Sequence, residues 1–108
     1  MRKMSGTREE FENELEAISK KTNVYFQPPE GFNLSYPCFV YKFSGLDVKR
    51  ADNGPYQMKN RYIVTYMTTD PEKGMSMVRK VLGRFAHVSF DRPYDTDGIY
   101  HYVFDIYF

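Results

Sequence analysis

The sequence contains no tryptophan and only one cysteine, Cys38. A single cysteine cannot form a disulfide within the chain, and this usage is typical of a reducing compartment. No apolar run approaches the roughly 20 residues that a membrane-spanning helix needs. The first residues are polar and acidic ones follow, unlike a secretory signal peptide. We therefore expect a protein of the cell interior with no membrane association.

A strong charge of either sign is also missing. Fifteen basic residues stand against 14 acidic ones, which gives a net charge of +1. A nucleic-acid-binding domain normally carries a clear basic excess, so we expect no specific nucleic-acid binding. The seven glycines are scattered, and none has the spacing of a phosphate-binding loop. The sequence therefore predicts no cofactor.

Aromatic residues are abundant instead, with ten tyrosines and nine phenylalanines in 108 residues. Tyrosine is enriched at protein interfaces, and aromatic side chains also fill small cores. A chain of this length is typical of one domain and buries roughly two-thirds of its unfolded surface. We predict a single domain over 1–108, with a loose N-terminus over 1–6.

Two helices are predicted from the capping residues at their N-termini. Thr7 and Glu10 fit a capping box that predicts a helix over 8–21. Asp70 is a favoured cap, and Pro71 at the first helical position predicts a second helix up to about Arg84. The side chains expected to face the core are Phe11, Leu15, Ile18, Met75, Val78, Leu82 and Phe85.

Five apolar or aromatic runs predict strands. They cover residues 24–26, 36–44, 56–69, 87–90 and 99–108. The run over 36–44 is nearly continuous, which predicts that both of its faces are covered for part of its length. The order α-β-β-β-α-β-β favours an α+β fold, a mainly antiparallel sheet of about five strands with two helices packed on one face.

The stretch over 45–57 lacks the periodicity of a packed element. Asp52-Asn53-Gly54-Pro55 is a strong turn signal within it. We expect a hairpin arm that projects from the body. Two interpretations stay open: the arm is mobile in the isolated protein and becomes ordered against a neighbouring protein, or it is merely a solvated hairpin.

The last ten residues alternate between two faces, and one face carries only large apolar side chains. Such an alternating, aromatic run is typical of a half-buried strand. No polar segment follows Phe108, and bare aromatic patches usually mark contacts. We expect this end to lie in the sheet or against another chain, and we expect a homo-oligomer.

The residues offer little support for catalysis. A dyad of Cys38 with His87 or His101 requires hydrogen-bond reach and an orienting group, but Cys38 lies in an apolar run where a buried, inert thiol is commoner. His101 shares a strand face with Val103 and Asp105. A cross-strand hydrogen bond or a solvated position is favoured there, since a metal site needs three or four ligands. We expect no enzyme activity and no metal.

Six segments, taken in order, resemble a known family. They are Tyr-Phe-Gln-Pro-Pro at 25–29, Tyr-Pro-Cys-Phe-Val-Tyr at 36–41, Arg-Tyr-Ile-Val-Thr at 61–65, Thr-Asp-Pro at 69–71, Phe-Asp-Arg-Pro-Tyr at 90–94 and Asp-Gly-Ile-Tyr-His-Tyr-Val-Phe at 97–104. The family is that of tail terminator, or tail completion, proteins of tailed bacteriophages and prophages. The resemblance covers most of the chain from about Val24 and part of the first helix. It departs at Tyr100, where relatives often have an asparagine.

The resemblance implies a helix–sheet fold, a ring of six subunits and no catalysis. Such a ring caps the tail tube, stops its polymerisation and presents a surface to the head. The implied partners are copies of this chain, the major tail tube protein and the head-connector protein. The implied location is the head–tail junction of the virion, and the bacterial host cytoplasm during assembly.

The expected contacts of such a ring lie on the arm and near the ends of strands. The candidate interface residues are Lys49, Arg50, Asp52, Arg92, Tyr94, Tyr107 and Phe108. Two alternatives remain open at this point. One is a head-closure or connector adaptor from the same joining region, which gene position beside the major tail protein would separate from a terminator. The other is a small regulator or enzyme from a prophage, which a monomeric mass in solution would favour.

Overall fold

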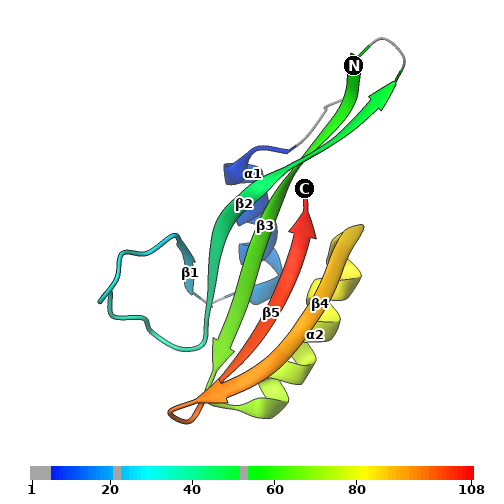
Figure 1. The fold of residues 1–108 in the computed structure, drawn as a ribbon. Helices are drawn as coiled ribbons and strands as arrows, with labels where there is room; N and C mark the ends of the chain where they lie inside the picture. Colours follow the sequence, from blue (N-terminus) through cyan, green and yellow to red (C-terminus); the bar gives the residue numbers. More distant parts are fainter. Residues whose placement is uncertain (1–5, 21–22, 52–53) are drawn as a thin grey trace.

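A computed structural model describes residues 6–20, 23–51 and 54–108, with the backbone alone over 48–51 and 54–58. Two helices and five strands follow one another along the chain in the order that the sequence predicts (Figure 1). In chain order they are α1 (Arg8–Ser19), β1 (Asn23–Phe26), β2 (Cys38–Ala51), β3 (Gly54–Thr68), α2 (Pro71–Arg84), β4 (His87–Thr96) and β5 (Ile99–Tyr107).

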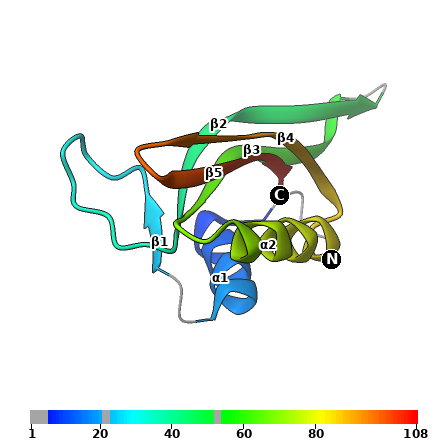
Figure 2. The same cartoon turned by 90° about the horizontal axis from the view of Figure 1, so that it is seen from below.

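The strands form one sheet in the order β1-β2-β3-β5-β4. β1 is parallel to β2, and the other three pairings are antiparallel. Both helices lie on the same side of this sheet, and the opposite side carries no helix (Figure 2). The predicted α+β fold is therefore confirmed. We call the helix-covered side the inner face and the other side the outer face.

Local capping fixes the start of each helix. The Thr7 hydroxyl accepts a hydrogen bond from the Glu10 N–H at 3.1 Å, while the Thr7 N–H donates to the Glu10 carboxylate at 2.8 Å. The Asp70 carboxylate accepts from the Glu72 N–H at 2.9 Å, and Pro71 opens α2. α1 is shorter than predicted because Lys20 adopts a φ of 52°, a positive value outside the right-handed helical region, and this ends the helix.

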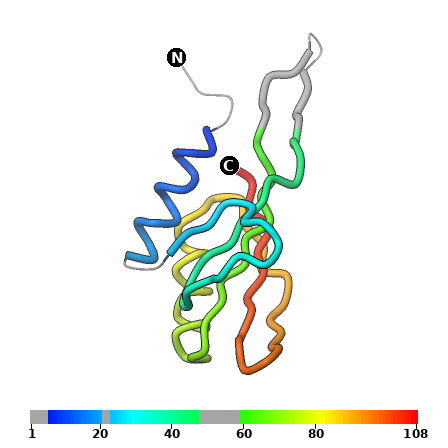
Figure 3. Tube along the Cα trace, turned by 90° about the vertical axis from the view of Figure 1, so that its left-hand side faces the viewer, coloured from blue at the N-terminus to red at the C-terminus, as the bar shows by residue number. Residues whose placement is uncertain are grey.

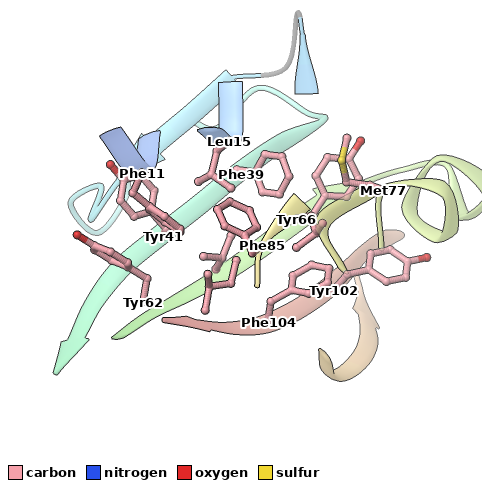
Figure 4. Close-up of a cluster of buried hydrophobic side chains, with 13 residues drawn as sticks. Phe11, Leu15, Phe39, Tyr41, Tyr62, Tyr66, Met77, Phe85, Tyr102 and Phe104 are labelled. Atoms are coloured by element: carbon pink, nitrogen blue, oxygen red, sulfur yellow. The ribbon is translucent and has the colours of Figure 1, made fainter. Parts of the chain in front are cut away.

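The core lies between the inner face and the helices, and it is mostly aromatic (Figure 4). Phe11 of α1 is its centre. The Phe11 ring stacks on Tyr62 with a centroid distance of 4.2 Å, and it meets the rings of Tyr41 and Phe85 at 5.4 Å. Such pairs add to the free energy gained by burial alone. The sequence-predicted core residues Phe11, Leu15 and Phe85 are buried, while Ile18 and Val78 are half-buried against the core.

The predicted core stripe of α2 is partly wrong. Met75 and Leu82 are 60% and 42% exposed, whereas Met77 and Val81 are buried. α2 is therefore rotated about its axis relative to the prediction. The cause is Gly74, which lies directly against the Tyr102 ring, where any side chain would collide. The helix approaches the sheet along this glycine, so the residues one step away from the predicted stripe face the core.

Three strand bounds also differ from the prediction. β2 and β3 stay paired through most of 45–57, with register shifts after Phe43 and after Lys49. β4 extends to Thr96 and closes on β5 through a two-residue turn at Asp97 and Gly98, whose φ angles are 54° and 77°. An Asp-Gly pair with positive φ at both positions fits the twist of a tight hairpin. The Phe108 N–H donates to the Asn60 carbonyl at 2.8 Å, so the last residue lies in the sheet as expected.

Candidate interaction surfaces

The outer face is the largest surface that the helices leave uncovered (Figure 2). Because side chains alternate along a strand, every second residue of β2, β3 and β5 points to this side. Four of them are apolar and only half-buried, namely Val40, Ile63, Met67 and Val103. The prediction that both faces of the 36–44 strand are covered for part of its length holds at the start of β2, where Cys38 and Phe39 point to opposite faces and are both fully buried. The outer face is therefore a mixed surface, partly apolar and partly polar, that no helix covers.

A half-buried ion pair lies within this surface. The Arg61 Nη2 and Asp105 Oδ1 atoms lie 3.0 Å apart, and both side chains are partly exposed. The same Asp105 oxygen and the Arg61 Nε atom have no hydrogen-bond partner among the described residues. The pair is therefore an electrostatic contact without an aligned hydrogen bond. Such pairs near a surface stabilise a fold by only about 0–1 kcal/mol, so we expect this pair to contribute little to stability.

Also on the outer face, the Tyr94 ring of β4 stacks on the His101 ring of β5. Their rings are nearly parallel, with a centroid distance of 4.5 Å and an interplanar angle of 7°. The His101 Nδ1 atom lies 3.1 Å from the Ile99 carbonyl oxygen. A carbonyl can only accept, so Nδ1 carries the proton in this contact. His101 is 9% exposed and Tyr94 is 46% exposed, so the tyrosine is the accessible partner.

A hollow of about 530 Å³ lies where the outer face meets the segment after β1. Gln27 forms one wall, and its side-chain oxygen accepts a hydrogen bond from the Phe43 N–H at 3.2 Å. The backbone N–H of Gln27 donates to the Tyr41 carbonyl at 2.9 Å. The hollow is lined by Gln27, Pro28, Val40, Tyr41, Lys42, Phe43, Ile63 and Thr65. It is a rigid recess with a single charged group, Lys42.

A two-stranded ribbon continues β2 and β3 beyond the body. β5 pairs with β3 only from Arg61 onward, and β1 pairs with β2 only up to Tyr41. Past these points, apart from the backbone hydrogen bonds between Asn60 and Phe108, β2 and β3 pair with each other, and Figure 1 shows them running on beyond the end of β5. The ladder shifts register between Phe43 and Gly45, and Gly45 has a φ of 156° that favours glycine. We call residues 45–51 and 54–60 the ribbon.

Two of the predicted interface residues belong to the ribbon, and a third lies at its tip in the sequence. Lys49 and Arg50 belong to β2, but the structure describes only their backbone, and Asp52 lies outside the described residues. Among the described side chains near the base of the ribbon, Phe43 and Leu46 are large, apolar and exposed. Figure 3 shows the Cα trace turned by 90° about the vertical axis from the view of Figure 1. Ordering of the arm against a neighbour stays a prediction.

The other predicted interface residues divide between the two faces. The register places Arg92, Tyr94 and Tyr107 on the outer face, where Arg92 forms an exposed ion pair with Asp91 at 3.6 Å. Phe108 lies on the inner side, and its ring is 5.4 Å from that of Phe11. Its aromatic surface is therefore used largely within this chain.

The outer-face residues Val40, Ile63, Met67 and Val103 are missing from the sequence-based candidates. The alternation over 61–67 signals them, because Arg61, Ile63, Thr65 and Met67 form a mixed polar and apolar side. Sequence alone does not say which side the helices cover, so this signal could not be assigned.

Two titratable side chains, those of Cys38 and Tyr41, are fully buried in the fold. Cys38 is fully buried, and burial raises the pKa of its thiol to about 11, which disfavours the reactive thiolate at neutral pH. The Tyr41 hydroxyl donates to the Glu12 carboxylate at 2.5 Å and accepts from Arg8 at 3.0 Å. Burial, with this glutamate, raises the pKa of Tyr41. This network links α1 to the sheet.

Within the described ranges, no cluster of three or more histidine, cysteine or acidic side chains is placed to hold a metal ion. Neither described helix is long and apolar enough to span a membrane. Comparison with protein-family models, with curated proteins and with solved structures found no match.

Proposed function

We propose that this protein is a structural subunit of a phage or prophage tail that forms a ring on the tail tube, ends its polymerisation and joins the tail to the head. The observation that carries the proposal is the division of the molecule into a closed and an open side. The helices cover one sheet face, while the outer face and the ribbon remain available. The resemblance of the sequence to tail terminator proteins supplies the kind of assembly.

A ring of identical subunits needs two different contact faces on each copy, because its contacts are heterologous. The sheet edges are poor candidates for these contacts. β1 has only four residues, and β4 carries Pro93, a register shift after Phe90 and several charged side chains. Proline, bulges and charges oppose the addition of a further strand. Neighbours therefore meet through side-chain surfaces, and the outer face and ribbon are left for the tube.

The test combines the protein with the major tail tube protein of the same phage or prophage and measures tube length by negative-stain electron microscopy. We expect short tubes with a ring at one end, and long, uncapped tubes without the protein. Binding to the head connector with no effect on tube length would identify an adaptor instead. If neither tube nor connector is bound, the structural role is refuted.

A variant that lacks the ribbon tests whether the ribbon contacts the tail tube. The ribbon is removed beyond Gly45 and Asn60 and the strands are closed by an Asn-Gly turn, which suits a two-residue hairpin. We expect this variant to keep its thermal midpoint but to lose tube capping. The matched control is Glu30→Ala in the exposed segment between β1 and β2, which leaves the ribbon, the outer face and both helices unchanged. Normal capping by the shortened protein would show that the ribbon has no role.

A further inference from the structure

The two helices that cover the inner face carry opposite charges. α1 contains five glutamates and one arginine, whereas α2 contains two lysines, two arginines and one glutamate. Both helices lie in one layer beneath the sheet (Figure 2). The helix side of the molecule is therefore acidic at α1 and basic at α2.

The two helices already attract each other within one chain. Arg84 of α2 forms an ion pair with Glu14 of α1, with Nε and Oε1 atoms 2.5 Å apart. The remaining exposed charges on these helices have no such partner: Glu9 and Glu16 of α1, and Lys73, Arg79 and Lys80 of α2, form no ion pair with other described residues.

The exposed side of α2 also has apolar surface. Met75 and Leu82 are both large and exposed, and seven residues place them two turns apart on one side of the helix. A shallow hollow lies beside Met75, between Glu72, Ser76, Arg79 and Lys80. An apolar stripe beside basic side chains matches an acidic helix, since charge complementarity orients the contact and apolar burial stabilises it.

We infer that the exposed side of α2 docks on α1 of a second copy of this chain. The contact repeats between molecules the pairing that Arg84 and Glu14 make within one. It is heterologous, because α2 of one copy meets α1 of the next and leaves a complementary helix free at each end, so the contact propagates until a ring closes. The inference rests on the ring in the proposed function and names its subunit interface.

The contact is small. A helix of 14 residues is about 21 Å long, so one helix pair covers much less than the roughly 800 Å² that each partner of a stable complex usually buries. Association of two copies is therefore weak and falls with ionic strength, and a closed ring or a tail tube is needed to hold many copies together.

The experiment measures self-association of the full chain by sedimentation equilibrium at millimolar concentration, at low and at high ionic strength. The α2 variant is R79E/K80E and the α1 variant is E9K/E16K, and all four positions are exposed. We expect each variant to lower the association constant by at least about tenfold, because like charges then face each other. An equimolar mixture of the two variants, and a chain with all four changes, should regain the wild-type constant at low ionic strength.

The matched control is K42E/R92E, which makes the same change in net charge on β2 and β4, outside both helices. It should associate as the wild type does. An equal loss in this control without recovery in the mixture, or a wild-type chain that stays monomeric, would overturn the inference. So would binding of a polyanion such as heparin at α2 in place of a second copy. Tube capping by a normally associating R79E/K80E variant would reject the interface and leave the proposed function intact.

Discussion

The two faces of the sheet are built from the same strands but have different physical characters. The inner face presents Tyr62, Val64 and Phe104, which are fully or almost fully buried beneath the helices. The outer face presents the neighbours of these residues along the same strands, such as Ile63 and Asp105, and they are half-buried. A shift of one residue exchanges the two sets. The inner face determines stability, and the outer face is free to serve recognition.

The most direct test of the difference between the inner and outer faces is to remove an aromatic ring from each. Phe11→Ala should lower the free energy of unfolding by about 3–5 kcal/mol, because the ring is fully buried and a cavity remains. Tyr94→Ala on the outer face should cost about 1 kcal/mol, the value of a partly exposed aromatic stack. Urea denaturation of both variants measures the two effects. Equal losses would show that the outer face is also part of the core.

A second pair of variants compares the two sides of α2. Val81→Ala should cost about 2 kcal/mol since Val81 is fully buried. Leu82→Ala should cost less than about 1 kcal/mol, because much of that side chain is in solvent. Thermal unfolding of the two single variants gives the order. A larger loss for Leu82→Ala would restore the stripe that the sequence predicted.

The difference between these neighbours shows what the sequence can and cannot predict. The helix starts were predictable because Thr7, Glu10, Asp70 and Pro71 act on residues next to them in the chain. The alternation of β5 was predictable for the same reason, since a strand repeats every two residues. The rotation of α2 depends on Gly74 meeting Tyr102, a contact between segments far apart in the sequence.

The candidate interface shows the same limit. Arg92, Tyr94 and Tyr107 were chosen from the sequence and do lie on the outer face. Val40 and Val103 were not chosen, because they become an uncovered surface only when both helices lie on the other side. Face assignment is a property of the whole fold, so composition and spacing do not reveal it.

A third test compares the two glycines of α2, one against the sheet and one exposed. Gly74→Ala should destabilise the protein by about 1–3 kcal/mol, because the added methyl group collides with the Tyr102 ring. At Gly83 an added methyl meets nothing within 4 Å, so Gly83→Ala should stabilise by up to about 1 kcal/mol through helix propensity. Opposite shifts of the thermal midpoint are expected. Stabilisation by both substitutions would mean that α2 does not approach the sheet along Gly74.

The smallest expected effect concerns pH and Cys38, which is fully buried at the start of β2. Its thiol has a pKa of about 11 in the folded protein, against 9.0 for the exposed group, because burial disfavours the thiolate. The unfolded chain therefore loses this proton first. The contribution to stability is complete below about pH 9 and falls as pH rises towards 11, by about 1 kcal/mol at pH 10.

Comparison with Cys38→Ala isolates this contribution. Buried tyrosines such as Tyr66 and Tyr102, whose pKa values burial also raises, weaken the fold at alkaline pH in both proteins. We expect the free energy of unfolding of the wild type to fall by about 1 kcal/mol more than that of the variant between about pH 8 and pH 10. Parallel pH profiles would show that the thiol is accessible. In that case the start of β2, where Cys38 lies on the outer-face side of the sheet, would be open to solvent rather than sealed.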